Sequence, residues 1–228
     1  MKYTAIIPAA GMGSRMGINF NKIFIKIGET PIIRMTVEKF QNDPNCEAIH
    51  LAGRAGEIGS LREMLGGLSK VKGIHIGGIE RQDSIFNALQ AIEPTEYVFI
   101  HDGARPFVRP ETLNALSEAV VKHDAAICGV KPKDTLKRIS NSQVQETVDR
   151  EAVVIVHTPQ AFRYDLIMDA HRNAVDSNLA VTDDSMMVEA LGNVVHVVPS
   201  TYDNIKITTE EDLKVAESIL RKESELDV

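Results

Sequence analysis

The sequence of 228 residues has few cysteines, no excess of positive charge and no long apolar run. Its two cysteines, Cys46 and Cys128, lie far apart without the spacing of a metal site, which favours a reducing compartment. No stretch of about 18 apolar residues is present, so no membrane span is expected. The first residues lack the basic and apolar regions of an export signal. We therefore expect a cytoplasmic protein.

The charge balance is acidic. The chain has 25 lysines and arginines against 32 aspartates and glutamates, which gives a formal net charge of −7. Nucleic acids and anionic membranes bind basic surfaces, so neither is an expected partner. A polyphosphate ligand would therefore need positive charge concentrated in one place. Hydrophobic residues make up 43% of the chain, enough for a substantial core.

Apolar runs typical of strands alternate along the chain with segments of helical periodicity. The expected strands are residues 3–8, 48–52, 71–76, 97–101, 125–130 and 194–198. The expected helices are residues 31–40, 57–65, 83–91, 110–122, 164–175, 184–191 and 209–221. This alternation predicts an α/β fold, a Rossmann-like and mostly parallel twisted β-sheet flanked by helices. We expect residues 1–228 to form a single domain.

Residues 131–157 interrupt the alternation because they are polar and charged. Strand-like pieces at 135–139 and 144–148 flank a short polar turn, which is typical of a hairpin. A long hairpin without a core of its own needs a surface to lie on. We therefore expect a projecting β-arm for dimerisation, with a plain surface loop as the alternative.

A glycine-rich loop, residues 8–17, follows the first expected strand. Ligands of open parallel sheets bind at the carboxyl ends of strands, where backbone N–H groups can reach phosphates. The dinucleotide fingerprint fits poorly, since its third glycine comes one place late at Gly17. Arg54 follows the second strand in place of an acid, which keeps an NADP-dependent reductase open. Arg15 in the loop and Lys22 after it favour a triphosphate over a purely structural turn.

Further motifs appear in chain order and make the sequence resemble a known family. They are residues 8–22, 77–84, 101–107, 158–162 and 203–208. Together they are similar to the 2-C-methyl-D-erythritol 4-phosphate cytidylyltransferases, which belong to the sugar-phosphate nucleotidyltransferases. The related ribitol-5-phosphate cytidylyltransferases share the first loop but typically begin with Leu-Ala-Gly-Gly and lack an arginine such as Arg150. Here the loop begins Pro-Ala-Ala-Gly.

The resemblance implies an activity and its partners. It implies transfer of CMP from CTP to 2-C-methyl-D-erythritol 4-phosphate with release of pyrophosphate, a step of non-mevalonate isoprenoid biosynthesis. It also implies a homodimer in which the arm, residues 131–157, reaches the site of the neighbouring subunit. The alternatives are ribitol 5-phosphate as the acceptor, an NADP-dependent reductase and a catalytically silent nucleotide-binding regulator.

The metal and the catalytic residues are expected at strand ends. Asp102 and Asp203 offer carboxylates, which suit a Mg²⁺ cofactor. Arg15, Lys22 and Lys206 are the candidate catalytic residues, because attack on the α-phosphate of CTP adds negative charge that cations stabilise. A phosphate monoester is mostly dianionic at neutral pH, so no general base is needed. The expected mechanism is direct in-line displacement.

The resemblance also implies residues that contact the two substrates. For the nucleotide they are Pro8, Ala9, Ala10, Gly11, Gly13, Gly78, Arg81, Ser84 and Ala104. For the methylerythritol phosphate they are Arg105, Thr135, Arg150, Thr158 and Thr182. Plainer alternatives are a helix N-cap for Ser84 or Thr182 and an ion pair with Glu80 for Arg81. His101 is expected to be packed at a strand end rather than catalytic.

Overall fold

A seven-stranded sheet forms the centre of the molecule in the computed structural model, which describes residues 1–11 and 21–226. The strands, in spatial order, are β11 (His196–Pro199), β7 (Ala125–Val130), β10 (Ile155–Arg163), β6 (Tyr97–Ile100), β1 (Tyr3–Pro8), β4 (Cys46–Gly53) and β5 (Val71–Ile76). Neighbouring strands are parallel except where β10 pairs with β6 and β7. The predicted mostly parallel sheet is confirmed.

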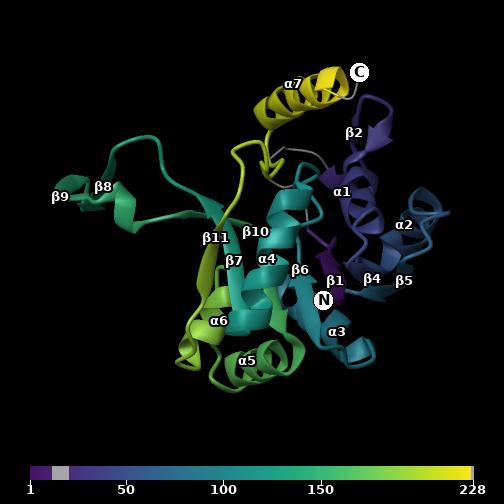
Figure 1. The fold of residues 1–228 in the computed structure, drawn as a ribbon, viewed down its shortest axis with the longest axis horizontal. Coiled ribbons are helices and arrows are strands. Elements are labelled where there is room, and N and C mark those ends of the chain that lie inside the picture. The colour runs from purple at the N-terminus through teal and green to yellow at the C-terminus, as the bar shows by residue number, and fades with distance from the viewer. Residues whose placement is uncertain (12–20, 227–228) are drawn as a thin grey trace.

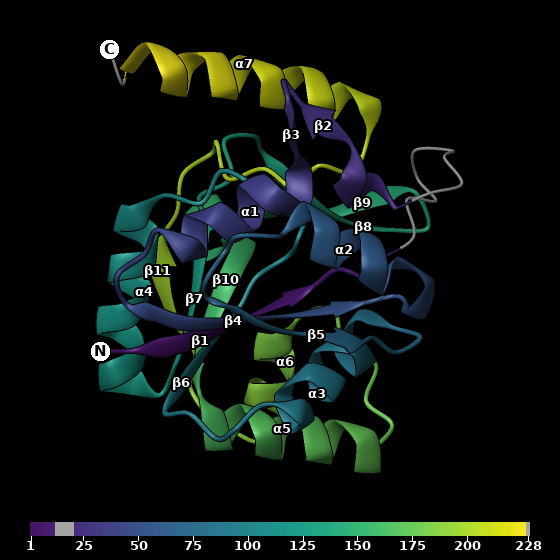
Figure 2. The same cartoon turned by 90° about the vertical axis from the view of Figure 1, so that its right-hand side faces the viewer.

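Helices cover both faces of this sheet, as Figures 1 and 2 show. They are α1 (Ile32–Gln41), α2 (Ile58–Met64), α3 (Arg81–Ala91), α4 (Pro110–His123), α5 (Tyr164–Asp176), α6 (Asp184–Ala190) and α7 (Glu210–Leu226). Their bounds lie within two residues of the predicted ones, apart from the longer α7. In the part of the chain that the structure describes, no helix has the length and apolar character that a membrane span requires.

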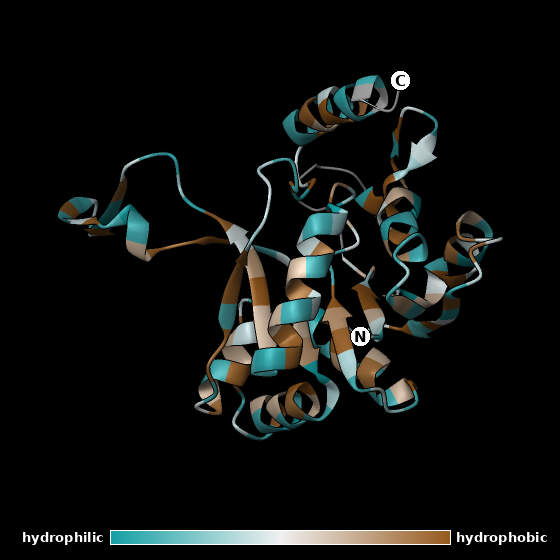
Figure 3. Cartoon of the chain, viewed as in Figure 1, coloured by the Kyte–Doolittle hydropathy of each residue, from teal (hydrophilic) through white to brown (hydrophobic). Residues whose placement is uncertain are grey.

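The core consists of two main clusters, one on each face of the sheet. Ile6 and Ile7 of β1 are both fully buried but belong to opposite clusters, since successive side chains of a strand alternate. Ile7 shares its cluster with Phe40 of α1 and Leu116 of α4, whereas Ile6 shares its cluster with Ile85 of α3. Burying each such side chain contributes about 1.5–3 kcal/mol. In Figure 3 the central strands are accordingly mostly hydrophobic.

A third cluster attaches α7 to the rest of the molecule. It joins Ile219 of α7 to Ile27 of β2 (Lys26–Ile27), which pairs with β3 (Thr30–Pro31). Phe107 and Ile207 belong to the same cluster. Figure 2 shows α7 lying across the molecule beside β2 and β3. The C-terminal helix therefore packs on the segment that leads into α1.

Strand β10 corrects the sequence prediction, which placed residues 155–157 in the arm and no strand at 158–163. The strand lies in the interior of the sheet, between β7 and β6. This strand could not be predicted from the sequence because of Pro159, since proline cannot donate a ladder hydrogen bond and is rarely found in a central strand. The structure accommodates Pro159 at a register shift between His157 and Gln160, where the ladder with β7 is interrupted.

The predicted hairpin is present as β8 (Leu136–Ser140) and β9 (Gln143–Val148), which pair antiparallel. Asn141 and Ser142 connect them with φ angles of 48° and 61°, values that suit a two-residue hairpin turn. Ile139 and Val144 of the hairpin are more than half exposed. Figure 1 shows the hairpin projecting away from the sheet on extended connections. We call residues 131–154 the arm from here on.

Candidate active site

A cavity of about 320 Å³ opens where β1 and β6 end and where the chain leaves β5. Its lining includes many of the residues predicted from the sequence: Pro8, Ala9, Ala10, Gly11, Lys22, Gly78, Arg81, Ser84, Asp102, Ala104 and Lys206. Arg15 and Gly13 lie outside the described residues. The carboxyl ends of the strands therefore bring together segments that are far apart in the sequence, as expected for a parallel sheet.

The described start of the first loop, residues 8–11, is held in place by Asn21, which is 1% exposed. The Asn21 amide donates to the Ala9 carbonyl at 2.7 Å and to the Glu57 carboxylate at 2.9 Å. Asn21 also caps the 3-10 helix η2 (Lys22–Phe24), so it sets where Lys22 enters the cavity lining. Sequence reasoning gave Asn21 no role, although its position directly before Lys22 was a usable signal.

Gly78 lines the cavity with backbone alone, and Gly77 precedes it where the chain leaves β5. A Cβ at Gly77 would lie 2.7 Å from the Ser84 hydroxyl oxygen, and one at Gly78 would lie 2.2 Å from the Asp83 Cβ. The Ser84 hydroxyl accepts from the Gly78 N–H at 3.0 Å and donates to the Glu80 carbonyl at 3.1 Å. Glu80, with Asp83 in a capping box, begins α3, so the N-cap alternative for Ser84 is wrong.

Asp102 is the centre of a buried charge cluster. Its carboxylate lies 3.0 Å from the Arg81 Nε, 2.8 Å from the Lys206 Nζ and 3.6 Å from the Arg105 Nε. Burial by itself raises the pKa of Asp102, but the charges of Arg81, Lys206 and Arg105 together hold that pKa well below its usual range. Asp102 is therefore ionised at any physiological pH.

Lys206 reaches this cluster because its segment pairs with the loop after β6. The Ile207 N–H donates to the Ala104 carbonyl at 2.9 Å. Ile207 is fully buried in the cluster with α7, so the backbone around Lys206 is fixed on both sides. The acidic chain thus concentrates Lys22, Lys206 and Arg81 at one cavity.

His101 stays neutral and positions its neighbours. It is fully buried, and burial lowers its pKa to about 4. Its Nε2 lies 2.9 Å from the Arg105 carbonyl, which can only accept, so this nitrogen carries the proton. Its Nδ1 then accepts from the Thr158 hydroxyl at 3.1 Å. The same hydroxyl oxygen accepts from the Asp102 N–H at 3.0 Å. Thr158 is 6% exposed, so its hydroxyl serves an internal role here.

The remaining residues predicted for the acceptor are more dispersed. Arg105 lies behind Asp102 and donates to the Asn204 carbonyl at 2.7 Å. Thr182 is exposed beside a recess of about 70 Å³ that Arg81 also lines. Asp183, whose carboxylate accepts from the Met186 N–H, caps α6, so the N-cap alternative for Thr182 is wrong.

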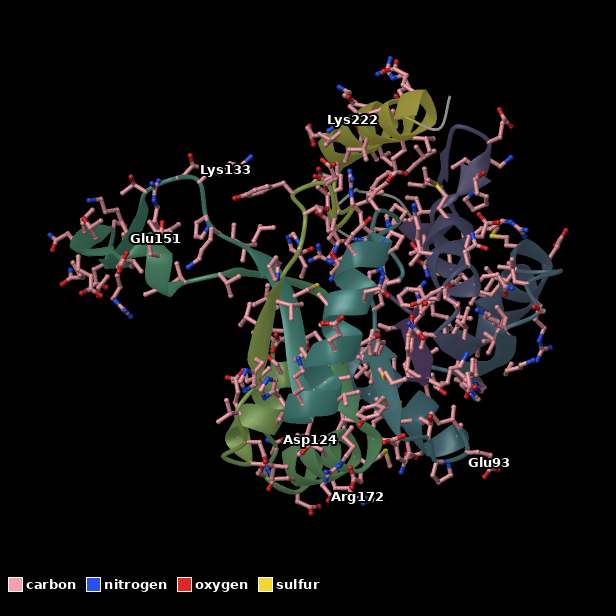
Figure 4. All side chains as sticks on the ribbon, viewed as in Figure 1. Glu93, Asp124, Lys133, Glu151, Arg172 and Lys222 are labelled. Carbon is pink, nitrogen blue, oxygen red and sulfur yellow. The ribbon has the colours of Figure 1, made fainter. Side chains whose placement is uncertain are left out.

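Thr135 and Arg150 are exposed on the arm. The Arg150 guanidinium donates to the Lys133 carbonyl at 3.0 Å. Lys133 and Glu151, labelled in Figure 4, lie on the part of the arm between the body of the molecule and the hairpin. Within one chain, the structure does not bring Thr135 and Arg150 to the cavity.

Asp203 requires a correction to the predicted metal site. Its carboxylate lies 2.8 Å from the Arg109 Nη2 and 4.0 Å from the Lys222 Nζ, and Asp203 is not among the residues that line the cavity. Asp203 is close to Lys206 in the sequence, but this does not fix the direction of its side chain. The ion pair with Arg109 directs the Asp203 carboxylate away from the residues that line the cavity. Within residues 1–11 and 21–226, no group of three His, Cys, Asp or Glu side chains is arranged to hold a metal ion.

Two acidic residues, Asp102 and Glu80, line the cavity, and the Glu80 carboxylate is used to cap α3, so Asp102 is the better donor for a hard divalent cation. Magnesium is commonly held by one or two carboxylates, with water and substrate phosphates completing its shell. Asp102 is ionised, lies at a strand end and lines the cavity, so it supplies such an oxygen donor. The donor set therefore suits a divalent metal that arrives with a phosphate-bearing substrate.

Comparisons with known proteins agree with this geometry. The family model described as IspD, 2-C-methyl-D-erythritol 4-phosphate cytidylyltransferase, matches residues 3–222. Relatives that carry the same enzyme name include one from Lysinibacillus sphaericus, 44% identical over 97% of both chains. Another, from Bacillus cereus, is 45% identical over 96% of this chain and 98% of its own.

Solved structures of the same family also superpose well on this chain. A 4-diphosphocytidyl-2C-methyl-D-erythritol synthase from Anaerococcus prevotii superposes with a TM-score of 0.87 at 33% identity, covering 96% of each chain. A 2-C-methyl-D-erythritol 4-phosphate cytidylyltransferase from Thermus thermophilus superposes with a TM-score of 0.80 at 30% identity, covering 97% of this chain and all of the other. The chain belongs to the 2-C-methyl-D-erythritol 4-phosphate cytidylyltransferase family.

Proposed function

We propose that the chain transfers CMP from CTP to 2-C-methyl-D-erythritol 4-phosphate, giving 4-diphosphocytidyl-2-C-methyl-D-erythritol and pyrophosphate. The observation that carries the proposal is the convergence of Lys22, Arg81 and Lys206 on one cavity beside Asp102. A triphosphate is the most negative part of either substrate. In a chain with a net charge of −7, such a local concentration of cations suits that group.

The nucleotide occupies the cavity with its base against the small residues. Ala9, Ala10 and Gly78 leave backbone groups within reach of a base edge, and Ser84 fixes the Gly78 backbone through its hydroxyl. Pro8, Gly11 and Ala104 complete this wall. In the proposal, Arg15 and Gly13 act from the same loop, outside the described residues.

The acceptor attacks without an activating base. Its phosphate is mostly dianionic at neutral pH, so an oxygen of that group attacks the α-phosphorus of CTP directly. The new P–O bond forms as the bond to the pyrophosphate oxygen breaks, with the two oxygens in line. Lys22 and Lys206 stabilise the charge that grows on the α-phosphate and the leaving pyrophosphate, together with Arg15. Positioning and charge stabilisation account for the rest of the rate.

We propose Mg²⁺ as the divalent metal, with Asp102 as the protein residue that holds it. When bound, the ion supplies charge neutralisation at the phosphate oxygens. The low pKa of Asp102, caused by the cations around it, keeps this carboxylate ready at neutral pH. Asp203 is left out of the proposed site, because its carboxylate pairs with Arg109 and Lys222.

The acceptor site is completed by a second copy of the chain. Arg105 and Thr182 belong to the body, and Thr158 supports this side of the site from within by holding Asp102. Thr135 and Arg150 are instead exposed on the arm, away from the cavity of their own chain. We propose that residues 1–228 act as one domain in a cytoplasmic homodimer. In it, each arm delivers Thr135 and Arg150 to the cavity of its partner. Arginine suits this task, since its planar fork binds phosphate oxygens in pairs.

Pyrophosphate release over a panel of nucleotides and acceptors tests the proposal. We expect release only when CTP, a divalent metal and 2-C-methyl-D-erythritol 4-phosphate are all present, and loss of release in EDTA. Equal or faster release with ribitol 5-phosphate would assign the enzyme to that acceptor instead. Oxidation of NADPH with a carbonyl substrate, in the absence of pyrophosphate release, would establish the reductase alternative.

A further inference from the structure

Asp184 is a buried acid for which neither the motifs nor the mechanism gives a role. It is the first residue of α6 and is fully buried. Its carboxylate oxygen Oδ2 forms an ion pair with the Arg81 Nη1 at 2.7 Å, but neither carboxylate oxygen has a hydrogen bond of regular geometry among the described residues. Taking a carboxylate out of water is costly, and pairing it with one cation rarely recovers the full cost. Stability alone is therefore a poor explanation of this residue.

Arg81 joins Asp184 to the cavity. Its Nε lies 3.0 Å from the Asp102 Oδ1, and its Nη1 contacts Asp184 from the other side. The guanidinium is thus fixed between a carboxylate of the cavity and a carboxylate of α6. Its side chain remains 28% exposed and lines both the cavity and the recess beside Thr182. A planar fork held at two corners has little freedom to rotate.

The start of α6 is itself anchored to β10. The Gln160 side chain is fully buried, accepts from the Asp184 N–H at 3.1 Å and donates to the Asp183 carboxylate at 2.7 Å. Two residues earlier on the same strand, Thr158 accepts from the Asp102 N–H. A short piece of one central strand therefore fixes both Asp102 and Asp184, the two acids that Arg81 bridges.

We propose that Asp184 is a positioning residue for the transfer reaction. It fixes the Arg81 guanidinium so that Arg81 orients the Asp102 carboxylate in the cavity. The same contact links the segment around Thr182 to the nucleotide site. This inference rests on the proposed function, since it assigns Asp184 to the chemistry at Asp102. Asp184 contacts no substrate and acts only through Arg81.

The test compares Asp184→Asn, which keeps the shape and removes the charge, with Asp184→Glu, which keeps the charge. Asp43→Asn is the matched control, because Asp43 is also buried, in the turn before β4, and its carboxylate accepts from the Tyr3 hydroxyl at 2.6 Å. For D184N we expect kcat to fall about 10- to 100-fold, the range typical of residues that orient a catalytic ligand, while the Kd of CTP changes far less. D184E should recover part of kcat, and D43N should lower Tm with kcat unchanged.

A double-mutant cycle separates positioning from structure. If Asp184 acts through Arg81, the loss of kcat in R81A/D184N should match that in R81A alone, because coupled residues are not additive. Three results would each overturn the inference. The first is additive losses of kcat in the double mutant, the second is a folded D184N with the parent kcat, and the third is an equal loss of kcat in D43N. If D184N does not fold, the comparison of R81A/D184E with R81A and D184E decides in the same way. A parent chain that releases no pyrophosphate from CTP would instead contradict the proposed function.

Discussion

The cavity and the arm both contain arginines paired with carboxylates, but the two regions place these pairs in different surroundings. In the cavity, the Asp102 side chain is 9% exposed and three cations surround it. On the arm, Arg138 and Glu146 lie 2.6 Å apart with more than half of each side chain in solvent. Exposed pairs are worth about 0–1 kcal/mol, because water and salt screen them. Short distance alone therefore says little about what an ion pair does.

The difference has a functional meaning. The cavity holds its charges in fixed positions before any substrate binds, which is what stabilisation of developing charge requires. The arm presents its charges to solvent on a two-stranded ribbon, and an isolated ribbon of this kind is only marginally stable in water. The body thus provides the preorganised chemistry, whereas in the proposed homodimer the arm would provide groups that are ordered by contact with the partner.

The largest expected effect concerns the cations of the cavity. Lys22→Ala should lower kcat about 100- to 1000-fold, since it removes stabilisation of charge that appears in the transition state. CTP binding, measured by calorimetry, should remain detectable. Lys26→Ala, an exposed lysine on β2, is the matched control and should keep the parent rate. Unchanged turnover in K22A would remove Lys22 from the mechanism.

The next prediction compares the two kinds of ion pair directly. Asp102→Asn leaves Arg81, Lys206 and Arg105 as like charges without their shared partner. Urea denaturation should show a loss of about 3–5 kcal/mol in the free energy of unfolding, as for other broken buried pairs. Glu146→Gln on the arm should cost less than about 1 kcal/mol. Equal losses in the two variants would contradict the contrast between the regions.

The response to pH should come from the body, since the arm contains no histidine. His171 is 2% exposed, and burial, helped by the Arg81 charge, lowers its pKa to about 4. Between about pH 6.5 and 4, His171 is therefore protonated in the unfolded chain but stays neutral in the folded chain. The free energy of unfolding therefore keeps its full value with respect to His171 above about pH 6.5, and it decreases as the pH falls from about 6.5 towards 4.

His171→Phe should remove part of this acid sensitivity. His171 stacks in parallel on Phe86, and its Nε2 has no hydrogen-bond partner in the described structure, so a phenyl ring can replace it. The difference in unfolding free energy between pH 7.5 and 4.5 should shrink by about 1–3 kcal/mol in the variant. Other buried histidines, such as His101 and His157, will keep part of the parent response. An unchanged difference would show that His171 does not contribute.

The smallest expected effect concerns the arm. Arg150→Ala should raise the KM of the acceptor about tenfold, a loss of one charge-assisted contact, with little effect on the KM of CTP. Arg138→Ala, elsewhere on the arm, is the matched control and should leave both values unchanged. Equal increases in both KM values would count against the proposed role of Arg150.

A mixture of K22A and R150A chains then tests the shared site. The assay uses an acceptor concentration well below the parent KM, where R150A has about a tenth of the parent activity. A mixed dimer contains one site with an intact body and an intact arm, so such sites should supply up to about a quarter of the parent activity if chains exchange at random. Activity no higher than the average of the two separate variants would show that the arm does not serve its partner.

Much of the fold could be predicted because local pattern and global architecture agree. The adjacent apolar residues Ile6 and Ile7 predict a strand that is buried on both faces. Pro110 predicts the start of a helix, and it is the first residue of α4. Strand β10 was missed because Pro159 signals against a central strand, and only its neighbours in space show how the ladder tolerates it.

The site could be predicted as a set of segments but not as a set of contacts. The expectation that Lys22, Asp102 and Lys206 would meet follows from the common edge at which parallel strands end. The direction of the Asp203 side chain and the contact of Asp184 with Arg81 depend on residues far away in the sequence. No local pattern carries such information.

The reversed direction of β10 has a consequence for how this enzyme can change. The chain leaves β7 at Val130, traverses the arm and re-enters the sheet at Ile155, which pairs with Val130 itself. The two residues that attach the arm therefore lie side by side, where β7 ends and β10 begins. Lengthening an insertion whose ends already meet adds only slowly to the entropy of closing it. The arm is therefore a segment whose length and sequence can change while the sheet and the cavity stay intact.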